Sequence, residues 1–177
     1  MEKSFKSSAK DYGMYLGLAL TLWTVIAYVI DLELMVNLWL NLLVLPVVII
    51  GFGVVSTAKS KHILGGFLSF KEAFTSYFIT IALGIGISFA VSIILFNYID
   101  TEAAITIKEI AVEKTIAMME GFNAPPDQIA KQVEAMENND LFSFKSQIFQ
   151  IAQSLVFFTI IGLIVAAIMK KSKPDSQ

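Results

Sequence analysis

Amide side chains are the first group in this sequence whose types and spacing could do chemistry. They lie at or near the ends of long apolar runs, at Asn37, Asn41, Asn97, Gln150 and Gln153. If they converge, they would form a small polar vestibule for a neutral solute. Alternatively, they make interhelical hydrogen bonds, each contributing about 0.6 kcal/mol in a membrane. We favour the structural role, because amides commonly connect neighbouring transmembrane helices.

Groups suited to catalysis or metal binding are sparse. The single histidine, His62, lies among lysines, so no Ser-His-Asp arrangement is expected around it. The chain has no cysteine, which excludes thiolate nucleophiles and thiolate metal sites. Glu102, Glu109, Glu113 and Glu120 are not grouped as in a calcium-binding loop. We therefore expect no enzyme activity, no cofactor and no metal site.

The stretch GGFLSFKEAF, residues 65–74, resembles a glycine-rich loop at first sight. A phosphate-binding loop of the P-loop type needs a lysine followed by serine or threonine after its glycines, and that pair is missing. The spacing of Ser69 and Glu72 instead predicts a capping box, in which each side chain accepts a hydrogen bond from the other residue's backbone N–H. The stretch is therefore expected to start a helix.

The composition indicates that these residues are carried by a membrane protein. Hydrophobic residues make up 56% of the 177 residues and charged residues only 16%, whereas about 25% of a typical soluble domain is charged. The mean hydropathy is +0.71. A net charge of -2 and the lack of arginine give no reason to expect a basic patch for nucleic acid. The expected partner is the lipid bilayer, and nucleic acid is excluded.

Four apolar windows without charge predict four transmembrane helices, at about residues 12–30, 36–57, 74–98 and 148–169. A helix needs about 20 residues to cross the hydrocarbon core, and a barrel strand would be shorter and alternating. The expected fold is an all-α membrane domain over residues 1–177, with an extracytoplasmic helical insert at about 100–145.

Lysines indicate the orientation of these helices. They cluster before the first window, between the second and third, and after the fourth, whereas residues 100–145 carry nine acids and four lysines. Lysines favour the cytoplasmic ends of transmembrane helices, so both termini are expected in the cytoplasm. The first window is expected to be a retained signal anchor, because no small-residue cleavage site follows it.

Small residues recur every four positions and predict how the helices pack. Such ridges let two helices approach closely in a membrane. The first and third windows are expected to meet along them, and Pro46 is expected to kink the second window. The ridge residues are Gly13, Gly17, Thr80, Gly84, Ser88, Ser92, Gly162 and Ala166.

The insert itself is expected to be a helical hairpin. Residues 102–121 have a glutamate stripe and an otherwise apolar surface, and a second helix follows with Pro126 in its first turn. Such a helix should bury its apolar surface against the bundle, the membrane or a partner. We expect a protein partner to bind here.

Three segments resemble one known family. They are YGMYLGL in the first window, GGFLSFKEAF before the third, and the acidic insert before a last window that ends in lysines. They are similar to an uncharacterised domain-of-unknown-function family of small four-helix inner-membrane proteins of the Bacteroidetes type. Lys71 stands where glycine is expected in relatives. The resemblance implies a membrane topology and no catalytic positions.

Two functions follow as expectations. The first is a multi-pass protein of the bacterial inner membrane, without enzyme activity, that acts as an accessory or interaction protein for another envelope protein or as a homo-oligomer. The alternative is a small oligomeric channel or carrier for a neutral or weakly charged solute. The absence of ionisable residues from the four windows argues against proton-coupled transport.

Overall fold

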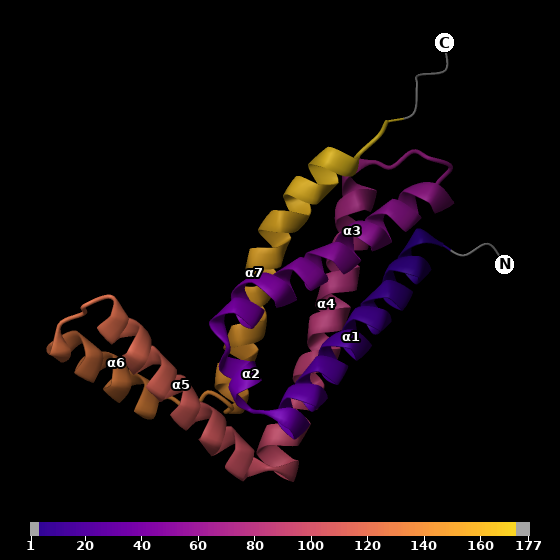
Figure 1. The fold of residues 1–177 in the computed structure, drawn as a ribbon. Coiled ribbons are helices and arrows are strands. Elements are labelled where there is room, and N and C mark those ends of the chain that lie inside the picture. Colours follow the sequence, from indigo (N-terminus) through magenta and orange to yellow (C-terminus); the bar gives the residue numbers. More distant parts are fainter. Residues whose placement is uncertain (1–3, 173–177) are drawn as a thin grey trace.

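Figure 1 shows the fold in a computed structural model, which describes residues 4–172. Four helical stretches are long and apolar enough to cross a membrane, namely Phe5–Ile30, Leu40–Ile63, Phe70–Ile99 and Phe144–Met169. The expected all-α membrane fold is therefore confirmed. In chain order the elements are α1 (Phe5–Ile30), α2 (Glu33–Val36), the π-helix η1 (Leu40–Val44), α3 (Leu45–Ile63), α4 (Phe70–Ile94), the π-helix η2 (Leu95–Ile99), α5 (Thr101–Gly121), α6 (Pro126–Glu137) and α7 (Phe144–Met169).

Three of the spans begin several residues before the apolar windows that predict them. In each case a serine hydroxyl caps the helix upstream of the apolar run, at Ser4, Ser69 and Ser143. A cap stabilises a helix by about 1 kcal/mol by accepting from an unpaired backbone N–H. The positions of these serines therefore determine where the three helices begin. The first turn of each helix is more polar than the apolar part that follows it.

The start of α1 and the end of α7 lie at the same end of the bundle, which we call the terminal end, and α5 and α6 lie at the other, the hairpin end (Figure 1). At the terminal end, Gly65 and Gly66 adopt positive φ angles of 72° and 87°, a conformation that glycine adopts without strain. Leu68 then exchanges backbone hydrogen bonds of 2.9 and 2.8 Å with Lys171. This short bridge ties the turn before α4 to the residues after α7.

The capping box at the start of α4 is present. Ser69 Oγ accepts from the backbone N–H of Glu72 at 3.3 Å, and Glu72 Oε2 accepts from the backbone N–H of Ser69 at 2.8 Å. The stretch GGFLSFKEAF is thus a turn followed by a capped helix start.

Close packing of α1 against α4 is the most extensive helix contact in residues 4–172. A Cβ added at Gly17 would lie 2.8 Å from the Cβ of Ile87, and Leu16 fills the space over Gly84. The two backbones can approach this closely only because the facing positions lack side chains. The expectation that the first and third spans meet is therefore confirmed.

Tyr77 of α4 is held between two glycines of other helices. A Cβ at Gly53 of α3 or at Gly162 of α7 would lie 2.6 Å from a ring carbon of Tyr77. The Tyr77 side chain is 1% exposed. The ring therefore fills the space that the two glycines leave, and it joins α3, α4 and α7 in one core.

A chain of hydroxyl groups lies beside this ring. The Ser60 and Ser76 oxygens are 2.7 Å apart, and the Thr80 and Ser56 oxygens are also 2.7 Å apart. Thr80 Oγ1 lies 3.0 Å from the backbone carbonyl of Ala9 in α1. All four hydroxyl residues are fully buried, so these contacts link α1, α3 and α4 inside the bundle.

The second span is irregular where Pro46 was expected to kink it. The N–H of Leu45 bonds to the carbonyl of Leu40, five residues back, which makes one π-helical turn at η1. Proline has no N–H, and its ring crowds the carbonyl four residues before it. The wider turn before Pro46 lets the chain continue as one helical span.

The hairpin of α5 and α6 extends sideways from the bundle (Figure 1). Its root is a small core in which Ala103 and Ile107 of α5 pack with Leu95, Phe96 and Phe142. Beyond this root, none of the described side chains of α5 or α6 is buried. The hairpin thus has its buried core at one end, and its remaining described side chains are half-buried or exposed.

Candidate functional site

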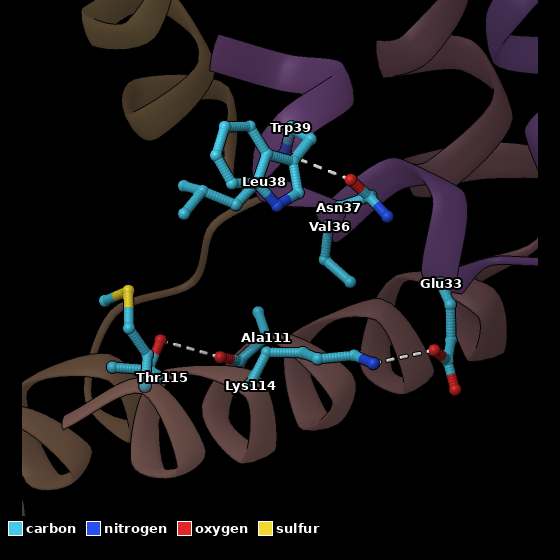
Figure 2. A pocket seen from close by; sticks show the side chains of 9 residues that line it. Glu33, Val36, Asn37, Leu38, Trp39, Ala111, Lys114 and Thr115 are labelled. Carbon is cyan, nitrogen blue, oxygen red and sulfur yellow. Dashed lines mark hydrogen bonds and ion pairs between the residues drawn. The ribbon is translucent and has the colours of Figure 1, made fainter. Parts of the chain in front are cut away.

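A groove lies in the angle between the hairpin and the bundle. It has a volume of about 420 Å³, and we call it the hairpin groove. Figure 2 shows Lys114 reaching along α5 toward Glu33, with Leu38 and Trp39 on the other wall. The lining residues are Glu33, Val36, Asn37, Leu38, Trp39, Ala111, Lys114, Thr115 and Met118.

One ion pair crosses the groove. Lys114 Nζ lies 2.8 Å from Glu33 Oε2, and the two side chains are 54% and 56% exposed. The hydrogen bond to Glu33 and its negative charge raise the pKa of Lys114. Solvent-exposed pairs of this kind contribute little to stability. Water or a ligand can therefore separate the two charges at little cost.

Local hydrogen bonds fix the bundle wall of the groove. Asp31 Oδ1 accepts from the N–H of Glu33 at 2.8 Å, which starts α2. Asn37 Oδ1 accepts from the N–H groups of Trp39 and Leu40 at 3.0 and 3.2 Å. An asparagine that caps backbone donors in this way stabilises a turn into a helix. Trp39 is therefore held where the second span begins.

The apolar part of the groove is open. Leu38, Trp39 and Met118 are 54%, 70% and 45% exposed. The exposed apolar surface continues from Trp39 onto Leu42 and Leu43 of the second span. The groove thus combines a charged pair with an apolar path that runs along a membrane-spanning helix.

A second contact fixes the angle at which α5 leaves the bundle. The Tyr28 hydroxyl donates to Asp100 Oδ2 at 2.8 Å, and Asp100 Oδ1 accepts from the N–H of Ala103 at 2.9 Å. The backbone bond from Ala103, together with the bond from Tyr28, lowers the pKa of the Asp100 carboxyl. Asp100 therefore caps α5 and ties it to α1.

The structure does not bring the amide residues together. Asn41 donates to the carbonyls of Met35 and Asn37, and Asn97 donates to the carbonyl of Ile93 in its own helix. Gln150 donates to the carbonyl of Leu141, and Gln153 is exposed. Within residues 4–172, no hydrogen bond joins two of these amide side chains. Helix ends leave carbonyls unpaired, and several of the amides bond carbonyls near such ends.

A separate cavity of about 160 Å³ lies among the four spans, toward the hairpin end. Its walls are mostly apolar, with the hydroxyls of Thr24, Ser88 and Ser154 among the lining residues. Ser88 and Ser92, which continue the small-residue ridge of α4, are only half-buried. The helices thus separate slightly toward this end. The other ridge residues are buried, namely Gly13, Gly17, Thr80, Gly84, Gly162 and Ala166.

The other chemically active residues form no centre. His62 is exposed in the last turn of α3. Among residues 4–172, no three His, Asp or Glu side chains are grouped so that they could hold a metal ion.

The sequence did not indicate the hairpin groove, nor did it indicate Ser56 and Ser60 of the hydroxyl chain. Glu33 and Lys114 are 81 positions apart, and no pattern in the sequence pairs them. Ser56 and Ser60 could have been found, because two hydroxyls four residues apart lie on one face of a helix.

One comparison with known proteins identifies the family of this chain. Residues 11–171 match the family model described as Protein of unknown function (DUF4199). The chain belongs to this family. No curated protein and no solved structure matches it.

Proposed function

We propose that this member of the DUF4199 family is a non-enzymatic accessory protein of the bacterial inner membrane, and that its hairpin binds another envelope protein. The observation that supports this most is the hairpin itself. Its root is packed, yet Met118 and Phe122 near its far end are 45% and 80% exposed. A helical pair that presents apolar side chains away from its own core is typical of an interaction surface.

The proposed orientation has both termini in the cytoplasm and the hairpin outside. Lys59, Lys61, Lys170 and Lys171 are all at the terminal end of the bundle. Lysines in short segments beside transmembrane helices favour the cytoplasmic side. The acidic hairpin between the third and fourth spans then faces the exterior.

The experiment is affinity purification from gently solubilised membranes, followed by size measurement and mass spectrometry. The matched variant replaces residues 112–134 with a short Gly-Ser linker, which removes the far part of the hairpin. We expect the unaltered chain to form a complex of defined stoichiometry and the shortened chain to lose it. An identical set of co-purifying proteins for both chains would contradict the proposal.

One observation favours a second candidate function, a channel or carrier for a small neutral solute. All four spans contribute to the cavity of about 160 Å³. Glycerol or urea uptake by liposomes tests it, with Ser154→Leu to fill the cavity and Gly86→Leu as a control at a position with open space. Uptake that only Ser154→Leu abolishes would favour this candidate over the first.

A further inference from the structure

We propose that the hairpin groove binds one phospholipid with a zwitterionic, primary-amine headgroup, of the phosphatidylethanolamine type. The inference rests on the proposed membrane location of the hairpin and does not depend on a protein partner. In this arrangement Lys114 binds the lipid phosphate, Glu33 binds the ammonium group, and an acyl chain lies over Leu38 and Trp39.

The position of the groove along the bundle suits a headgroup. Trp39 immediately precedes the span that begins at Leu40, and Tyr98, at the same end of the bundle, is 80% exposed. Tryptophan and tyrosine favour the depth where lipid headgroups meet the hydrocarbon. The groove therefore opens where phosphate groups and the first acyl carbons lie.

The charges of the groove complement a zwitterion. The carboxylate of Glu33 and the ammonium of Lys114 are neighbours, with no net charge between them. A headgroup that enters between them exchanges one exposed ion pair for two charge-assisted hydrogen bonds, each stronger than a neutral one. The exchange is easy because the original pair is solvent-exposed.

The surroundings of the groove select among headgroups. Residues 100–145 carry nine acids and four lysines, so an anionic lipid is repelled by the hairpin. A quaternary ammonium has no N–H to donate to Glu33, whereas a primary ammonium has three, as lysine does. The predicted order of binding is therefore ethanolamine headgroup, then choline, then glycerol.

The apolar wall accounts for the acyl chain. Leu38 and Trp39 lead directly to the exposed Leu42 and Leu43 along the second span. On the α5 side, Met118 has a flexible side chain that adapts to irregular apolar surfaces. One chain can thus follow the helix into the hydrocarbon while the headgroup stays in the groove.

The test is native mass spectrometry of the full chain released from nanodiscs that contain equal amounts of phosphatidylethanolamine, phosphatidylcholine and phosphatidylglycerol. We expect one retained phosphatidylethanolamine per chain. Glu33→Gln and Lys114→Met should each reduce its retention by about tenfold, as expected for loss of one charged hydrogen bond. Glu134→Gln and Lys131→Met, on the exposed surface of α6, are the matched controls and should retain it.

Two results would overturn the inference. One is equal retention of the three lipids, or preference for phosphatidylglycerol, by the unaltered chain, a measurement that needs no variant to fold. The other is unchanged retention in folded Glu33→Gln and Lys114→Met. If either occurs while the protein complex survives, the lipid site is wrong and the proposed accessory function stands.

Discussion

The two ends of the bundle are built in different ways. At the terminal end, Tyr77 is enclosed by Gly53 and Gly162, and buried hydroxyls link three helices. At the hairpin end, the spans line a partly open cavity, two of them have a π-helical turn, and the hairpin leaves most of its surface open. The terminal end is thus closely packed, whereas the hairpin end is open.

This difference indicates which contacts contribute most to the free energy of folding. In a membrane, lipid is as apolar as leucine, so close packing and hydrogen bonds hold helices together. Both are concentrated at the terminal end. Changes there should unfold the protein, whereas changes at the hairpin end should alter binding and leave the bundle intact.

The largest effect is expected from Gly162→Ala. The new methyl group would lie 2.6 Å from the Tyr77 ring, and Gly53 lies close to the opposite edge of that ring. Overpacking of this kind costs about 1–3 kcal/mol, so the thermal midpoint in detergent should fall clearly. Gly86→Ala is the matched control, because nothing lies within 4 Å of its Cβ position. A similar midpoint for both variants would show that the terminal end is not tightly packed.

A smaller loss of stability is expected from Thr80→Val. Valine keeps the shape of threonine but removes the hydroxyl beside Ser56 and the Ala9 carbonyl. The loss should be about 1 kcal/mol, within the range measured for hydrogen bonds between membrane helices. Chemical denaturation in mixed micelles measures it. Thr106→Val, whose hydroxyl bonds only within exposed α5, should change nothing.

Shortening the hairpin should disturb the bundle less than either change. Replacement of residues 112–134 by a linker removes no buried side chain, and the root at Ala103 and Ile107 remains. We expect a midpoint within the error of the unaltered chain, measured in the same detergent. A loss of stability larger than that of Thr80→Val, measured by the same chemical denaturation, would mean that the hairpin is part of the folding core.

The smallest effect on stability is expected from the hydrogen bond between Tyr28 of α1 and Asp100, the residue that caps α5. The pKa of Asp100 is lowered in the folded chain, so ionisation of this carboxylate stabilises the fold above its usual pKa of about 3.9. That contribution is lost as the pH falls through the lowered value. Carboxyl carbon NMR should report a midpoint below about 3.9. Tyr28→Phe should raise this midpoint partway toward the usual pKa of an aspartate. An unchanged midpoint would show that the hydrogen bond from Tyr28 to Asp100 does not form.

The helices and much of their packing could be predicted from the sequence. The four long stretches without charged residues predict the spans. The recurrence of Gly13, Gly17 and Gly84 predicts the contact of α1 with α4. Ser69 and Glu72 are close in sequence, so their capping box can be read directly.

The hairpin groove could not be predicted, because its two charges come from distant parts of the chain. The hydrogen-bond partners of the amide side chains could not be predicted for a related reason. The positions of Asn37 and Asn41 near the end of an apolar window predict an interhelical contact, but position along a helix does not determine which face a side chain occupies. Nearby carbonyls and backbone N–H groups compete for the same amides and are reached at lower entropic cost.

The central claim is that the hairpin and the terminal end lie on opposite sides of the membrane. The chain has no cysteine, so a single introduced thiol can be labelled without background. Lys131→Cys should react with a membrane-impermeant maleimide on intact spheroplasts, and His62→Cys should react only after permeabilisation. Labelling of both positions from the same side, or of His62→Cys alone on intact spheroplasts, would contradict the account.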